Sequence, residues 1–475
     1  MRKLFFTVAI ALVSLASTAQ TSMRANTDPS VKPGDDFWQY AVGGWLKANP
    51  LDAQHPENGA FTDLYELNNE RINKLILAYA EKKDLPQGSD GQKIGALYRL
   101  YMDSVSRNRM GYELIMPYLR QVREVQTRDE ALRLMYELDA KGFNAAPFGL
   151  SLGETIGKLY VKEFFPESSK QRVYRMVKDL QQAFEDRLKE NTWMSDSTKA
   201  KALEKLHAMH INVGYPDKWQ DMEKFIDIRE TENLVENFIR IKQESRQAGL
   251  RKYWHQPVDK TMMPCSPQTV NAFYHPLFNS INFPAAILQP PFFDPEADYV
   301  CNYGAIGAVI GHEMTHGFDD QGCQFDKDGN LKNWWTAEDK ARYDERTKVI
   351  ADWFSEQEGV PGLKVNGQKT LGENVSDNGG LKIAYRAYKN RMASEPLSDV
   401  EGFTPDQRFY LAYARVWACN STPEYIAMLV NSDVHSPARL RVMAALPMID
   451  TWYEAFGIQP TDKMFIPKEK RALVW

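Results

Sequence analysis

The chain has 475 residues, of which 43% are hydrophobic and 25% are charged, proportions that are typical of a soluble globular protein with two or three domains. Its formal net charge of −5 at pH 7 offers no basic surface for nucleic acid or for an anionic membrane. Composition therefore argues against a nucleic-acid partner and leaves an enzyme or a binding protein open.

Residues 1–19 have the pattern of an export signal. Arg2 and Lys3 precede the apolar stretch 4–15, and the small residues at 17–19 are typical of a cleavage site. The apolar stretch is too short to span a bilayer comfortably. We expect an exported protein without a transmembrane anchor, in the periplasm, at the cell surface or outside the cell. Oligomeric state is left open, and so are the three disulfide pairings that export would permit among four cysteines: Cys265, Cys301, Cys323 and Cys419.

The stretch that follows the signal, residues 20–60, predicts an extended arm that packs on a larger body. This prediction rests on the aromatic residues Phe37, Trp38 and Trp45 and on the adjacent glycines Gly43 and Gly44. A carbohydrate-binding aromatic patch is the alternative interpretation of the same residues.

Residues 61–250 have helical periodicity. Leu64, Leu67, Ile72 and Leu75 recur at the spacing of one helix face. A second helical block begins near residue 154. Within the first block, which extends to residue 153, a capping box at residues 127–130 (Thr-Arg-Asp-Glu) predicts the start of a helix that ends near residue 142.

From residue 251 onward the pattern changes to strands, loops and helices. The β-prone segments 269–274 and 281–288 are separated by a turn and predict a hairpin at the edge of a sheet. A helical segment with uncharged flanks follows, and it contains the sequence His-Glu-x-x-His. We therefore expect the chemistry of the protein to lie in residues 251–475.

The spacing of His312 and His316 places both imidazoles on one face of a helix, where they can bind one metal ion. Glu313 is the next residue and can reach a water on that metal without binding the metal itself. Two imidazole nitrogens and a third protein ligand leave one position open in the tetrahedral geometry that Zn²⁺ prefers. The motif has only three fixed positions, so a chance match is the alternative.

A second acidic segment supplies the missing ligand. Glu373 lies on another predicted helix and can complete the metal site, and Asp377 follows one turn later, where it can accept an N–H from a ligating histidine. Taken alone, Glu373 is better interpreted as a solvated carboxylate on a helix surface. Together with the histidine motif, it is better interpreted as a ligand.

These motifs, in this order, resemble the neprilysin/endothelin-converting-enzyme family (M13) of zinc metallopeptidases, and in particular its secreted bacterial endopeptidases. The matching segments are 271–274, 283–293, 309–320, 370–380, 433–437 and 474–475. The resemblance implies a mainly α (α+β) fold, with a thermolysin-like catalytic domain and its small β-sheet at 251–475. It also implies a helical cap domain at 61–250 and an entry arm at 20–60.

The resemblance further implies a role for each matching residue. One Zn²⁺ per chain would be bound by His312, His316 and Glu373. Glu313 would be the general base and Asp377 the carboxylate behind a ligating histidine. The remaining catalytic positions are His435, which would stabilise the oxyanion and be oriented by Asp433, and Arg441, which would bind the substrate carbonyl.

Short peptides are the implied substrates. Asn271 and Ala272 would hold the peptide backbone as an added strand. An apolar S1′ pocket would favour cleavage on the amino side of bulky hydrophobic residues, and its expected lining is Ile287, Phe292, Val309 and Trp417. Ordinary core packing is the alternative for these four side chains.

The chain departs from the family in length. Near residues 150–156 the first helical block passes directly into a later family segment, so a sizeable middle portion of the cap domain is missing. The catalytic residues survive this loss. The favoured function is therefore a zinc endopeptidase, and the alternative is a catalytically impaired relative that binds peptides or zinc.

Overall fold

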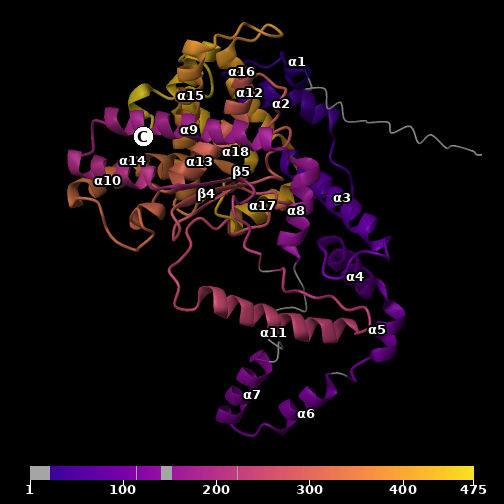
Figure 1. The fold of residues 1–475 in the computed structure, drawn as a ribbon. Helices are drawn as coiled ribbons and strands as arrows, with labels where there is room; N and C mark the ends of the chain where they lie inside the picture. Colours follow the sequence, from indigo (N-terminus) through magenta and orange to yellow (C-terminus); the bar gives the residue numbers. More distant parts are fainter. Residues whose placement is uncertain (1–21, 114, 141–151, 222) are drawn as a thin grey trace, which may run out of the picture.

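The computed structural model describes residues 22–113, 115–140, 152–221 and 223–475 (Figure 1). Helices predominate within these residues, and the strands form three small sheets, so the predicted mainly α fold is confirmed. No helix in this part of the chain is both long and apolar enough to cross a membrane. The export signal predicted at residues 1–19 lies outside the described residues.

Two helices meet backbone to backbone at the centre of the fold: α13 (Ala308–His316) and α15 (Leu371–Ser394). A Cβ atom added at Gly311 would lie 2.6 Å from the carbonyl oxygen of Gly380, and one added at Gly380 would lie 2.4 Å from the backbone nitrogen of His312. Because glycine has no Cβ, this pair permits the close approach. The contact places the histidines of α13 beside the first turns of α15.

The main hydrophobic core surrounds this helix pair and is built from elements that are distant in sequence. Helix α9 (Glu167–Glu190) packs against both α13 and α15, and α10 (Asp196–His207) packs against α9 (Figure 1). From the other side, α16 (Pro405–Trp417) buries its apolar face in the same cluster. Helices α9 and α10 belong to the range 61–250 that was predicted as a cap, and the domain boundary at residue 250 stays a prediction.

The arm predicted at residues 20–60 is helical, so the prediction of an extended arm was wrong. Helix α2 (Phe37–Ala48) starts after Asp36, whose side chain accepts a hydrogen bond from the N–H of Gln39 at 2.9 Å. Its buried aromatic residues recur at helical spacing, and this pattern outweighs the glycine pair. Gly44 is required where α2 meets α1 (Met23–Asn26), because a Cβ there would lie 2.2 Å from a backbone oxygen of α1.

A three-stranded sheet lies beside α13 and has the order β2 (His210–Gly214), β4 (Ser280–Pro284), β3 (Phe273–His275). Strand β2 runs parallel to β4, and β3 pairs with β4 in antiparallel orientation, with Tyr274 opposite Ile281. The predicted hairpin is confirmed. Strand β3 forms the edge of the sheet, where an extended peptide can add another strand.

Two further strand pairs join distant parts of the chain or neighbouring turns. Strand β1 (Glu57–Gly59) pairs in antiparallel orientation with β7 (Cys419–Ser421) and ties the N-terminal region to the end of α16. Strands β5 (Glu358–Val360) and β6 (Leu363–Lys364) form a short hairpin. No disulfide joins the four cysteines, although all of them lie in the described residues.

A second hydrophobic cluster lies away from the central helices. It is formed mainly by α3 (Ala60–Ala80), α4 (Asp90–Met102), α8 (Gly153–Phe164) and α11 (Leu234–Tyr253). Helices α3 and α4 carry the chain from the core toward the outer helices in the lower part of Figure 1, and α8 lies back beside the core. The helical character predicted for residues 61–250 is confirmed for the described part of that range.

Three outer helices bury no residue: α5 (Ser104–Met110), α6 (Met116–Glu124) and α7 (Arg128–Ala140). The predicted capping box of α7 is present, because Glu130 N–H donates to the Thr127 hydroxyl and Thr127 N–H donates to the Glu130 carboxylate. Residues 150 and 151 of the predicted junction at 150–156 lie outside the described residues, and α8 begins within the rest of it. The outer helices form the least packed part of the described chain.

The remaining helical segments complete the C-terminal half. They are α12 (Tyr299–Asn302), a π-helical turn at Tyr303–Gly307, α14 (Ala337–Ser355), α17 (Pro423–Ser432), α18 (Ala438–Met443), α19 (Asp450–Phe456) and three 3₁₀ turns, Gly322–Gln324, Leu446–Met448 and Lys468–Lys470. The π-helical turn leads directly into α13, and such turns are frequent at functional sites.

Candidate metal centre and active site

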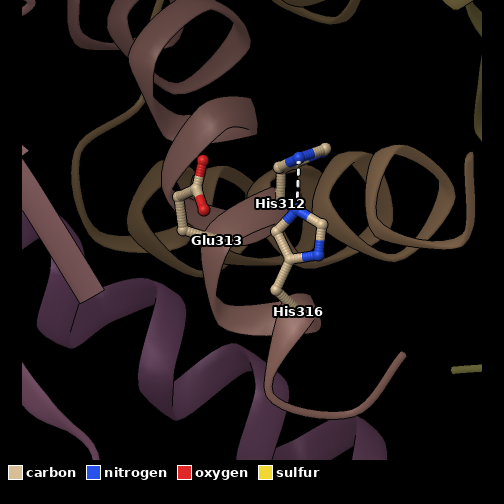
Figure 2. Close-up of side chains that lie close together, drawn as sticks. All are labelled: His312, Glu313 and His316. Atoms are coloured by element: carbon tan, nitrogen blue, oxygen red, sulfur yellow. Dashed lines mark hydrogen bonds between the residues drawn. The ribbon is translucent and has the colours of Figure 1, made fainter. Parts of the chain in front are cut away.

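The two histidines of α13 face each other at the predicted site. His312 Nε2 and His316 Nε2 lie 2.9 Å apart, and their rings are perpendicular with centroids separated by 4.5 Å (Figure 2). His312 is buried and His316 is largely buried. The i, i+4 spacing therefore brings both Nε2 atoms to one point, as the sequence predicted.

Each imidazole is oriented by a carboxylate on its other nitrogen. His312 Nδ1 lies 2.8 Å from Asp377 Oδ1, and His316 Nδ1 lies 2.6 Å from Asp319 Oδ2. The hydroxyl of Ser376 is also 3.1 Å from His316 Nδ1. Carboxylates placed in this way fix the tautomer and the ring orientation, so that both Nε2 atoms remain available to a metal ion.

Glu373 reaches the same point from the first turn of α15. Its Oε2 atom lies 3.2 Å from His312 Nε2 and 3.5 Å from His316 Nε2. This oxygen is buried, and no hydrogen-bond partner satisfies it in the described residues. Burial alone raises the pKa of Glu373, but the nearby His312, His316 and His435 outweigh it and lower the pKa below the usual range, so the carboxylate is ionised.

This donor set fits Zn²⁺. Two imidazole nitrogens and one carboxylate oxygen converge from two rigid helices, and that oxygen makes no hydrogen bond in the described residues. Three protein ligands of these types leave a position open for catalysis. Glu313 belongs to the same group, since its carboxylate and the two histidines place ligand atoms within 4.8 Å of one another (Figure 2).

Arg441 and Asp377 form a buried pair behind His312. Arg441 Nε donates to Asp377 Oδ2 at 2.8 Å and Arg441 Nη2 donates to Oδ1 at 2.6 Å. Burial alone raises the pKa of Asp377, but Arg441 outweighs it and brings the pKa to about 2. The same guanidinium lies 3.8 Å from the ring centroid of Trp417. Arg441 thus holds the carboxylate that orients His312 and also lines the cavity beside it.

His435 approaches from the loop after α17. Its Nε2 atom lies 3.2 Å from Glu373 Oε2, and its Nδ1 lies 2.8 Å from Asp433 Oδ1. The structure therefore brings the predicted pair His435 and Asp433 to the metal site. The imidazole is 43% exposed, so it can contact a bound substrate. Its role as an oxyanion donor stays a prediction.

Two cavities open on either side of these groups. The first has a volume of about 360 Å³ and contains Glu313 together with five of the six predicted substrate-binding residues: Asn271, Ala272, Ile287, Val309 and Trp417. The second has a volume of about 600 Å³ and reaches His316 and Glu373. Asn271 and Ala272, which immediately precede the edge strand β3, line both cavities.

Phe292 is the predicted pocket residue that the structure places differently. It is fully buried and does not line either cavity. Instead, Phe61 lies between Phe292 and Trp417, at 4.6 Å and 5.6 Å between ring centroids. Phe61 lines the first cavity, and Phe292 supports it from behind. The alternative of core packing thus describes Phe292 in this structure.

Sequence reasoning missed two residues at this site. Asp319 follows His316 at i+3, and that helical spacing is a signal that could have identified it. Phe61 lies more than 200 positions before the motifs in the chain, and the β1–β7 pairing and the packing of α3 on α16 bring it to the cavity. No local pattern in the sequence points to Phe61.

Comparison with protein families identifies two matching regions. A model of peptidase family M13 matches residues 271–472. The N-terminal model of the same family matches residues 33–155 and 150–216, in two segments that meet where the missing middle portion was predicted. Together these matches cover more than half of the chain.

Curated relatives share sequence over about two thirds of the chain. Neprilysin-1 of Caenorhabditis elegans is 39% identical over 339 residues, which cover 69% of this chain and 45% of that protein. The neutral endopeptidase of Lactobacillus helveticus is 37% identical over 327 residues, which cover 68% of this chain and 48% of that protein. The chain therefore spans less than half the length of these relatives.

Solved structures share the fold. The zinc metalloprotease Zmp1 of Mycobacterium tuberculosis, in complex with an inhibitor, superimposes with a TM-score of 0.83 at 24% identity and covers 95% of this chain and 99% of its own. PepO from Lactobacillus rhamnosis has a TM-score of 0.78 at 21% identity and covers 94% and 100%. At these identities the likeness concerns the fold.

Proposed function

The chain belongs to peptidase family M13, and on this premise we propose that it is a zinc-dependent endopeptidase that cleaves short peptides on the amino side of bulky hydrophobic residues. One observation carries the proposal. Glu373 Oε2 is buried without a hydrogen-bond partner and faces His312 Nε2 and His316 Nε2, while carboxylates hold the opposite nitrogen of each ring. Such a converging, unsatisfied donor set is what a catalytic zinc site requires.

The metal would be held by His312, His316 and Glu373, one ion per chain. When bound, Zn²⁺ would supply a Lewis acid that polarises a peptide carbonyl and brings the pKa of water toward about 7. Asp377 and Asp319 keep the two imidazoles in the orientation that this binding needs.

Glu313 would move the protons of the reaction. Its carboxylate lies in the first cavity beside the converging ligand atoms. In this position it can accept a proton from the attacking water and later deliver it to the leaving amine. Proton transfer by a positioned side chain typically contributes about 10²–10⁴ in rate.

His435 and Arg441 would stabilise the charge that develops on the carbonyl oxygen. His435 is oriented by Asp433, and Arg441 is anchored by Asp377, so neither donor must reorganise during the reaction. Donors fixed in advance in a water-poor site are worth more than the same donors in water.

The substrate would bind as an added strand along β3, with Asn271 and Ala272 contacting its backbone. The adjoining cavity is lined by the apolar side chains of Ile287, Val309 and Trp417. Phe61 and the supporting Phe292 complete this wall, so a bulky hydrophobic side chain fits at S1′. We also propose export of the protein, on the basis of the signal pattern at residues 1–19.

The length of the chain favours a second candidate. Because the chain spans less than half of its curated relatives, a relative that binds peptides or zinc without turnover is the alternative function. The two candidates differ in whether the shortened helical region still closes the cleft well enough for catalysis.

Cleavage of a quenched peptide with Phe or Leu at P1′ tests the proposal. We expect the purified full chain, loaded with zinc, to cleave on the amino side of that residue, and we expect a chelator to stop cleavage. Folded, zinc-loaded protein that binds the peptide without cleaving it would establish the alternative. Cleavage that persists after complete removal of metal would contradict both.

A further inference from the structure

A separate cavity of about 310 Å³ lies on the other side of the first turn of α3 from the candidate active site. Its walls come from α1, α2, α3, α16 and the segment 290–302. Ala60 lines both cavities. Of the next residues of α3, Phe61 lines the cavity at the active site, whereas Leu64 and Leu67 line the separate cavity. A ligand here would not need to contact the metal centre.

The lining of this cavity is largely apolar. Its apolar residues are Met23, Ala41, Ala60, Leu64, Leu67, Pro290, Pro291, Ala297, Leu411 and Ala412. The volume is at the lower end of the range of about 300–1,000 Å³ that is typical of small-molecule sites, which combine an apolar lining with a few polar groups. The cavity is therefore suited to a small apolar group.

One cation faces this apolar space. Arg415 lines the cavity, and its Nη1 atom is buried with no hydrogen-bond partner in the described residues. The guanidinium of Arg415 lies over the ring of Trp45, 4.8 Å from the ring centroid. This contact is a cation–π interaction and gives the guanidinium N–H groups no hydrogen-bond acceptor. Burial lowers the pKa of Arg415 to about 10, even though Asp63 opposes the shift.

Neither of the two carboxylates that line the cavity accepts a hydrogen bond from Arg415. Asp63 is exposed and lies beyond ion-pair distance, although its charge acts on Arg415. Asp294 accepts the N–H of Glu296 at 2.9 Å and so belongs to its own turn. A buried guanidinium N–H without an acceptor costs free energy that an anionic ligand would recover.

We propose that this cavity binds an apolar carboxylate, with the carboxylate on Arg415 and the apolar group between α3 and α16. A medium-chain fatty acid and the free C-terminal hydrophobic residue of a peptide share this chemistry. The proposal is independent of catalysis, because none of the residues that carry it belongs to the metal centre or to the groups assigned to peptide cleavage.

Calorimetric titration of the full chain with matched charged and neutral probes tests the proposal. The probes are octanoate against octanol, and N-acetylphenylalanine against N-acetylphenylalaninamide. We expect at least one carboxylate to bind tighter than its neutral counterpart by about tenfold to a hundredfold, the value of a hydrogen bond to a charged group. Whichever carboxylate binds tighter identifies the source as lipid-like or peptide-like.

Variants locate the binding. Arg415→Met should remove the preference for the carboxylate, whereas Arg386→Met, at an exposed arginine of α15 paired with Glu190, should keep it. Asp63→Asn should tighten carboxylate binding, because it removes a competing negative charge. This second variant keeps the test valid if Arg415→Met does not fold.

Three results would overturn the proposal. Equal binding of charged and neutral probes to the unmodified chain would show that Arg415 does not select the ligand. A carboxylate preference that survives in Arg415→Met would place the binding elsewhere, including at the candidate active site. Loss of stability in Asp63→Asn without tighter binding would show that Asp63 is the natural partner of Arg415.

Discussion

The helix pair at the metal centre and the outer helices α5, α6 and α7 differ in how they are supported. Every predicted zinc ligand lies on α13 or α15, which are packed on α9 and α14. By contrast, the outer helices bury no residue and expose large apolar side chains: Val105, Leu119, Val122, Leu132, Met135 and Tyr136.

A shortened chain would affect the metal site and the outer helices differently. The ligand geometry depends on contacts within the main core, which is complete around α13 and α15. The exposed apolar residues lie in the region that precedes the junction near residues 150–156, where the sequence predicts that a middle portion of the family is missing. Loss of such a portion would remove cover from the outer helices without removing support from the metal centre.

The largest expected effect is loss of the metal from Glu373→Val. This change removes the carboxylate oxygen that, within the described residues, lies at ion-pair distance from both histidine Nε2 atoms. A site with two imidazoles alone binds zinc weakly. We expect elemental analysis to find no zinc in the purified variant and peptide cleavage to be lost. The matched change Glu124→Val on α6 should leave zinc content and cleavage unchanged. An equal loss of zinc from this variant would show that the metal centre depends on the outer helices.

Glu313→Gln should lose turnover and keep the metal. The amide cannot accept the proton of the attacking water, and general-base catalysis of this kind is worth about 10²–10⁴ in rate. We expect kcat to fall by that factor, whereas zinc content measured on the same sample stays at one ion per chain. Near-normal turnover of the zinc-loaded variant would show that another group is the base, and Glu137→Gln on α7 serves as the control.

The different roles proposed for Glu373 and Glu313 could be predicted from the sequence, because each role depends on the local spacing of residues. His312 and His316 are one helical turn apart, and Asp377 is one turn beyond Glu373. The hairpin before α13 and the cap of α7 are local in the same sense. Patterns that span four to ten residues were therefore sufficient to select side chains that converge in the structure and to predict several elements.

The remaining features depend on contacts between distant segments. Phe61 reaches the cavity because β1 pairs with β7 and α3 packs on α16. Helix α9 packs on α13 and α15 although its amphipathic pattern equally fits a helix of a cap domain. In α2, the glycine pair suggested an extended chain, but burial of the neighbouring aromatic residues decided the conformation. Sequence periodicity shows that a face is apolar and does not show which partner covers it.

A pair of leucine variants measures the difference in packing directly. Leu180 of α9 is fully buried and Leu119 of α6 is 39% exposed. Truncation of a buried leucine leaves a cavity, so we expect Leu180→Ala to lower the free energy of unfolding by about 2–5 kcal/mol. Leu119→Ala should change it by about 0.5 kcal/mol or less. Urea denaturation monitored by circular dichroism gives both values, and equal losses would show that α6 is packed in solution.

The smallest expected effect concerns Lys205 of α10, which forms hydrogen bonds with the loop after α13. Its ammonium donates to the carbonyl oxygens of Gly322 and Phe325, each at 2.7 Å, and this loop includes Asp319, which orients His316. Burial lowers the pKa of Lys205 to about 8 from the ordinary 10.5, against the opposing effect of nearby anionic groups. The folded state therefore releases this proton at a lower pH than the unfolded state does.

The sign of the pH dependence follows from this order of proton release. Between pH 8 and pH 10.5 the unfolded chain binds a proton at Lys205 that the folded chain has lost, so rising pH favours folding. Relative to Lys205→Met, we expect the unmodified chain to gain about 2 kcal/mol of unfolding free energy between about pH 7 and pH 9.5. Groups common to both proteins cancel in this difference, which urea denaturation at the two pH values measures. A difference that stays constant with pH would mean that Lys205 titrates normally and that the loop after α13 is more open to water than its packing indicates.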